Sequence, residues 1–78
     1  MATIRGVKLP EGVHLDEVLF EFQTIERSAR VVAVDPASNT EVVMVGDPSY
    51  GEETLKRLAI RKLAFVIAKK QKAARGEN

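Results

Sequence analysis

Two valine-rich runs, residues 31–34 and 42–45, constrain the fold of this chain more than any other feature of its sequence. β-Branched residues favour strands, and Asp35-Pro36 between the runs is typical of a type I turn. We expect an antiparallel hairpin in which Val34 pairs with Glu41. Both faces of this hairpin are largely apolar, whereas an antiparallel sheet with one solvent-exposed face usually alternates. The sequence therefore predicts that both faces need a cover.

A third strand is predicted before this hairpin. Phe20, Phe22 and Thr24 alternate with polar residues, and a period of two indicates a half-buried strand. We expect Phe20 and Phe22 to share a core with Leu63 and Val66 of the C-terminal segment.

A single long helix is predicted after the sheet. Residues 52–75 contain no proline or glycine, and their apolar side chains fill roughly half of a helical circumference. Ser49 and Glu52 have the spacing of a capping box, in which each side chain bonds the amide of the other residue. We therefore expect a helix over about residues 50–71, with its apolar half packed on the sheet.

Together these elements predict an α+β domain over residues 18–71. Its fold class is a three-stranded antiparallel β-sheet packed by one C-terminal α-helix, in the order βββα. Residues 1–17 form an N-terminal arm that is either irregular or lies across the domain as a cover. We expect residues 72–78 to be a disordered tail.

One helix covers only one face of the sheet, so a second apolar surface is left over. The predicted register places Val43 and Val45 on that face, while Leu58 and Phe65 project from the other half of the helix. These four residues are the predicted partner-binding positions, to be covered by the arm, a second copy or another protein. The sequence favours a non-enzymatic protein–protein interaction module that forms a homodimer or docks on a protein partner.

Composition excludes several classes of function. A chain of 78 residues forms one domain. It has no cysteine and a single histidine, His14, so disulfides, cysteine-ligated zinc and multi-histidine metal sites are excluded. No phosphate-binding loop, dinucleotide fingerprint or nucleophile–base pair is recognisable. We expect no catalytic residue, cofactor, metal ion or small-molecule substrate, and the chain is not expected to be an enzyme.

The charge is unevenly distributed along the chain. Residues 1–55 carry four basic and ten acidic side chains, whereas residues 56–78 carry eight basic and one acidic. Nucleic-acid binding by the basic helix is the alternative function. Its predicted residues are Arg57, Arg61, Lys62, Lys69 and Lys72.

Membrane partners and secretion are not expected. The longest apolar run, residues 63–68, is far shorter than the roughly 20 residues that span a bilayer. The N-terminus has no apolar run of the kind that a signal peptide needs. A bacterial cytoplasmic protein is the default expectation.

From Phe20 onward the chain resembles a small bacterial family of uncharacterised proteins, a domain of unknown function. The resemblance covers about residues 20–70. It rests on Phe20-Glu21-Phe22, Asp35-Pro36-Ala37, Thr40-Glu41-Val42, Val45-Gly46, Arg61-Lys62-Leu63, Val66 and Ala68-Lys69. These motifs are structural, so the resemblance implies a fold and no substrate, cofactor or catalytic residue.

Overall fold

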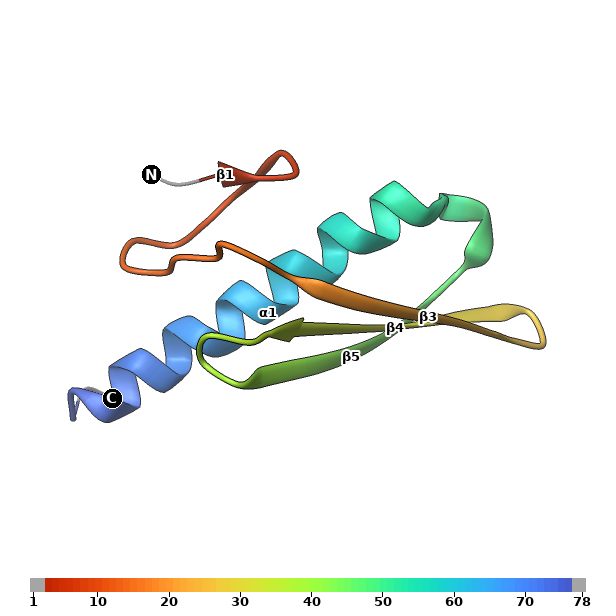
Figure 1. Cartoon of the computed structure of the whole chain (residues 1–78). Coiled ribbons are helices and arrows are strands. Elements are labelled where there is room, and N and C mark those ends of the chain that lie inside the picture. Colours follow the sequence, from red (N-terminus) through yellow and green to blue (C-terminus); the bar gives the residue numbers. More distant parts are fainter. Residues whose placement is uncertain (1–2, 77–78) are drawn as a thin grey trace.

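The computed structural model describes residues 3–76 and shows two antiparallel sheets and one long helix (Figure 1). The elements in chain order are β1 (Thr3–Ile4), β2 (Val7–Lys8), β3 (Leu19–Ile25), β4 (Ser28–Asp35), β5 (Thr40–Gly46), the 3-10 turn η1 (Pro48–Tyr50) and α1 (Glu52–Ala74). β1 and β2 form a small hairpin, and the larger sheet has the order β3-β4-β5. The predicted α+β fold is confirmed, with the hairpin as an addition.

The register of the larger sheet follows from its two tight turns. Val34 pairs with Glu41, as expected, on either side of the loop that Asp35-Pro36 begins. The β3–β4 connection is a two-residue turn closed by Ile25 and Ser28, with Glu26 at a φ of 56°. Alternation then sends every second side chain of each strand toward α1.

The start of α1 differs from the expected capping box. Ser49 lies in η1, and its main-chain N–H donates to the Asp47 carboxylate at 2.9 Å. α1 begins at Glu52 after Gly51, with no side-chain cap. The prediction was wrong because Asp47 and Pro48 start a separate 3-10 turn, which takes up the serine. The hydrogen bonds from Ser49 lower the pKa of Asp47 below its ordinary value.

The helix continues beyond its expected end. α1 runs to Ala74, so residues 72–74, expected within a disordered tail, are helical. Residues 77–78 lie outside the described part of the chain. No helix within residues 3–76 is long and apolar enough to cross a membrane.

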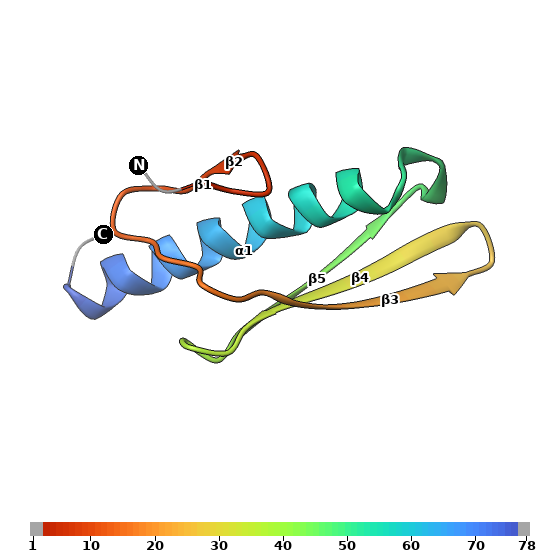
Figure 2. The same ribbon diagram turned by 45° about the horizontal axis from the view of Figure 1, so that its top comes forward.

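α1 is the middle layer of the molecule, between the sheet and the N-terminal arm (Figure 2). The arm buries Val7, Leu9, Val13 and Leu15 in the same core as the helix and the sheet. The other buried apolar residues are Ala29, Val31, Ala33, Val42, Leu55, Ala59, Ile60, Leu63, Ala64 and Ile67. The apolar half of the helix therefore serves two layers, where one had been expected.

Polar contacts hold the arm on the helix. The Gln71 side-chain amide donates to the carbonyl of Gly12 at 3.0 Å. Arg5 bonds Glu53 from the β1–β2 turn, where Arg5 and Gly6 have φ values of 50° and 79°. Two successive positive φ angles are typical of a type I′ hairpin turn. The arm is thus an ordered cover of the helix and leaves the far face of the sheet bare.

Candidate interaction surfaces

No segment within residues 3–76 covers the face of the sheet that is turned away from α1. We call it the outer face. Its apolar members are Leu19, Ile25, Val32, Val34, Val43 and Val45. Val45 is 66% exposed, Ile25 53% and Leu19 49%. Large apolar side chains exposed together on one face indicate a contact surface.

The outer face also carries charged and polar side chains. They are Glu21, Gln23, Ser28, Arg30 and Glu41. Arg30 donates to the Gln23 side-chain oxygen at 3.3 Å, and no ion pair forms among these residues. The surface is therefore amphipathic.

Two lysines of the helix contact one edge of the sheet. The Lys62 ammonium donates to the main-chain carbonyl of Val43 at 2.6 Å, on the free side of β5. Lys70 bonds the hydroxyl of the buried Thr40 at 3.1 Å, at the start of the same strand. A helix side chain that occupies an outward carbonyl of an edge strand hinders pairing with a further strand at that point.

The other edge of the sheet, along β3, carries two aromatic rings with cations close to them. The rings of Phe20 and Phe22 lie 6.3 Å apart and are only partly buried. The Lys56 ammonium lies 5.5 Å and 5.8 Å from their centroids, and the Arg5 guanidinium lies 5.5 Å from that of Phe20. No side chain of residues 3–76 hydrogen-bonds the main chain of β3.

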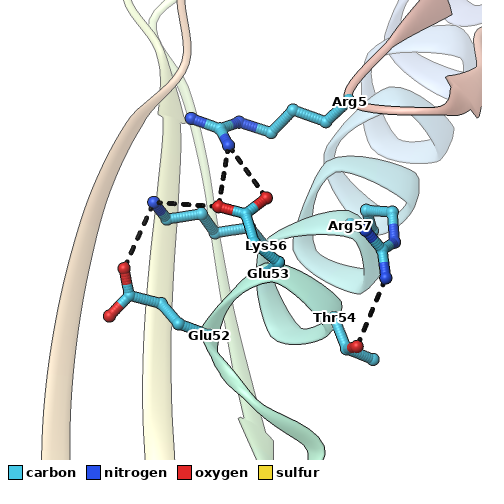
Figure 3. Close-up of polar contacts among 6 residues, drawn as sticks. All are labelled: Arg5, Glu52, Glu53, Thr54, Lys56 and Arg57. Carbon is cyan, nitrogen blue, oxygen red and sulfur yellow. Dashed lines mark hydrogen bonds and ion pairs between the residues drawn. The ribbon is translucent and has the colours of Figure 1, made fainter.

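Ion pairs hold these cations in place at the start of α1 (Figure 3). Arg5 lies 3.1 Å from Glu53, while Lys56 lies 3.3 Å from Glu52 and 3.8 Å from Glu53. The carboxylates are exposed, so these pairs position the cations over the rings and add little stability.

The third surface lies on α1, away from both the sheet and the arm. Phe65 is 61% exposed and Leu58 is partly buried. The Lys69 ammonium lies 5.5 Å from the Phe65 ring centroid. The predicted Leu58 and Phe65 positions therefore share a surface that is separate from Val43 and Val45.

The five predicted nucleic-acid-binding residues do not form a single free patch. Arg57 turns toward the arm, where its Cδ is 3.9 Å from the position of a Cβ on Gly6, and it donates to Thr54 at 3.3 Å. Lys62 is bound to β5. Arg61, Lys69 and Lys72 remain exposed around Phe65.

The buried polar groups have structural partners. The Ser38 hydroxyl donates to the buried Asp35 carboxylate at 2.6 Å and lies 2.8 Å from the Thr40 hydroxyl. This network fixes the β4–β5 turn. Within residues 3–76 no group of three or more His, Asp or Glu residues could hold a metal ion.

The sheet, η1 and most of α1 are also the part of the chain that a known family shares. Residues 15–70 match the family model described as domain of unknown function DUF6898. The chain belongs to this family. No curated protein and no solved structure matches it. The DUF6898 match includes β3, β4 and β5 and begins after the β1–β2 hairpin. The resemblance to a domain of unknown function is thus confirmed.

Sequence reasoning missed the β3 edge as a surface. The alternating aromatic residues of β3 indicate a strand, but they do not show that this strand lies at an edge of the sheet. The order β3-β4-β5 makes β3 an edge, and only the arm's position shows that the edge stays open.

Proposed function

We propose that this DUF6898 protein is a non-enzymatic protein–protein interaction module that self-associates as a homodimer. One observation carries the proposal. The arm packs on α1, and so the outer face and the β3 edge keep exposed apolar side chains that no segment of residues 3–76 covers. A second copy would cover part of this exposed surface.

The size of these surfaces sets the expected affinity. A standard protein–protein interface buries about 800 Å² per partner, and one side of a three-stranded sheet offers less. Part of the burial energy is lost to association entropy and side-chain ordering. We therefore expect a dimer in the micromolar range.

Sedimentation velocity and light scattering over a wide range of protein concentration test the proposal. We expect a reversible monomer–dimer equilibrium. A chain that stays monomeric at high micromolar concentration would overturn it. Two charge substitutions then locate the contact, because Val43→Glu disrupts the outer face and Phe65→Glu the exposed surface of α1.

Nucleic-acid binding is the second candidate, on a narrower basis. Arg61, Lys69 and Lys72 are exposed around Phe65, and residues 54–76 contain no acidic side chain. A salt-dependent affinity for RNA or DNA would support this candidate, since phosphate contacts release counterions. No binding at low salt, where electrostatic attraction is greatest, would remove it.

A further inference from the structure

We propose that two copies pair along β3, antiparallel and centred on Phe22, so that the two three-stranded sheets become one continuous sheet. This inference rests on the self-association proposed above and names its interface. The two-fold axis passes midway between the two Phe22 residues, perpendicular to the sheet, which leaves both helices on the same side.

The direction of the main-chain groups makes β3 able to pair. Val43 presents its carbonyl to Lys62 on the free side of β5. In an antiparallel strand the main-chain N–H and C=O groups of successive residues point to alternate sides. Val32 lies opposite Val43, so the main-chain groups of Val32 point toward β3, and those of Glu21, opposite Val32, point toward β4. The N–H and C=O groups of Phe20 and Phe22 then point outward at the free edge.

The β3–β4 turn gives the same result independently. A two-residue hairpin turn is closed by a hydrogen-bonded pair, here Ile25 and Ser28. Every second residue back from Ile25 therefore bonds β4. Phe20, Phe22 and Thr24 face outward, and pairing with a second copy supplies about six hydrogen bonds.

The two edges of the sheet are not equivalent. On the β5 edge Lys62 occupies the outward carbonyl of Val43, and Lys70 bonds the side-chain hydroxyl of Thr40. The β3 edge lies free along one margin of the sheet in Figure 2, and no side chain of residues 3–76 bonds its main chain. Within residues 3–76, β3 is therefore the edge on which no helix side chain occupies an outward main-chain group.

The side chains of β3 match themselves in one register. With Phe22 at the centre, Leu19 lies opposite Ile25 of the second copy. Phe20 lies opposite Thr24, and Glu21 lies opposite Gln23, a hydrogen-bonding pair. Apolar side chains thus meet apolar ones at both ends, and cross-strand pairs of this kind are stabilising.

Neighbouring registers are less favourable. A centre at Glu21 places this carboxylate opposite its own copy, and like charges directly opposite are destabilising. A centre at Gln23 places Glu21 opposite the apolar Ile25. The Phe22 register avoids both conflicts.

Stacking of two outer faces meets a similar conflict. If the two-fold axis lies between the two faces and runs parallel to β4, Arg30 meets Arg30 of the second copy. If the axis runs across the strands at Val32, Glu21 meets Glu21 of the second copy. The edge pairing also gives new apolar neighbours to Leu19 and Ile25, which are about half exposed in the single chain.

Amide hydrogen exchange followed by NMR tests the pairing directly. In the dimer we expect the amides of Phe22 and Thr24 to be protected, and dilution to the monomer to remove that protection. The amides of Glu21 and Gln23 bond β4 and stay protected in both states. A dimer in which the Phe22 and Thr24 amides exchange freely would overturn the edge pairing and leave the proposed function intact. A monomeric chain would overturn both.

A matched pair of proline substitutions provides the second test. Thr24→Pro removes an outward N–H that only the second copy uses, and proline is tolerated on edge strands. Glu41→Pro removes an outward N–H from the β5 edge and serves as the control. We expect both variants to fold, and Thr24→Pro alone to weaken the dimer by about tenfold or more. Equal dimer affinities in two folded variants would contradict the pairing.

Two charge substitutions at Gln23 test the register. Within one chain Gln23 lies opposite Arg30, so Gln23→Glu favours the folded monomer and Gln23→Lys disfavours it. Across the proposed interface Gln23 lies opposite Glu21, so there a lysine at position 23 is favourable and a glutamate is unfavourable. We expect Gln23→Lys to dimerise several-fold more tightly than Gln23→Glu, even though it is the less stable monomer. The opposite order, or dissociation by Val43→Glu with no effect of the β3 variants, would refute the inference.

Discussion

Replacing Leu9 by alanine tests whether the N-terminal arm is part of the folded core. Leu9 is 2% exposed and belongs to the core that the arm shares with α1 and the sheet. The substitution removes three carbon atoms, worth about 0.8 kcal/mol each in transfer free energy, so the loss is roughly 2.4 kcal/mol before any cavity is counted. With the cavity included, buried leucine-to-alanine changes cost about 2–5 kcal/mol. We therefore expect a loss of about 3 kcal/mol.

This loss is large for a small domain. At about 0.05–0.15 kcal/mol per residue, a chain of this size has roughly 4–12 kcal/mol of stability. Equilibrium unfolding in urea measures the change as a lower midpoint with an unchanged slope. Lys8→Ala is the matched control, because Lys8 is the exposed neighbour of Leu9 on β2. If both variants unfold at the wild-type midpoint, the arm does not contribute to the core and the cover assigned to it is wrong.

Three further predictions concern single contacts. Gly46→Ala places a Cβ 2.8 Å from the buried Leu55 side chain, so we expect overpacking to lower the free energy of unfolding by about 1–3 kcal/mol. Urea unfolding measures this loss, and adding Leu55→Val should relieve it. The lowered pKa of Asp47 means that its hydrogen bond with Ser49 stabilises the fold above the unfolded pKa and is lost as pH falls through the folded value. Wild type should exceed Asp47→Asn in stability at pH 7 and match it in acid, as followed by thermal unfolding. Lys62→Met opens the β5 edge, so light scattering should show a folded variant that aggregates with rising concentration.

The sheet could be predicted from the sequence because its signals are local. The valine runs show strands, and Asp35-Pro36 marks the loop between them, so the pairing of Val34 with Glu41 follows. The capping box failed for a local reason too. Asp47-Pro48 and Ser49-Glu52 are both typical of the start of a helix, and the 3-10 turn begins at the first of them.

The arm could not be placed from the sequence. Val7 and Leu9 are two residues apart, as are Val13 and Leu15, with a turn between the pairs. This spacing fits two short extended segments with one buried side, but it does not show which surface they cover. Strands of two residues have too little periodicity to be recognised, so the β1–β2 hairpin was missed.

The exposed apolar surfaces were predicted in part. The separation of Val43 and Val45 from Leu58 and Phe65 followed from sheet and helix periodicity, and their role in binding stays a prediction. The contact at the β5 edge depends on Lys62 reaching a strand 19 positions away. Such a long-range contact has no signature in the sequence, and without it the β3 edge does not stand out.

The place of α1 between the arm and the sheet also bears on the order in which the chain folds. Both sheet turns join neighbouring segments, so β3, β4 and β5 can associate early. The arm, in contrast, is tied to the helix across 48 positions at Arg5 and Glu53 and across 59 at Gly12 and Gln71. Contacts between distant segments form slowly because long loops must close first. Until α1 docks, the apolar sides of both the arm and the sheet face water, a condition that favours aggregation. Slow docking of this one helix would therefore lower the yield of folded protein without changing the stability of the molecules that reach the native state.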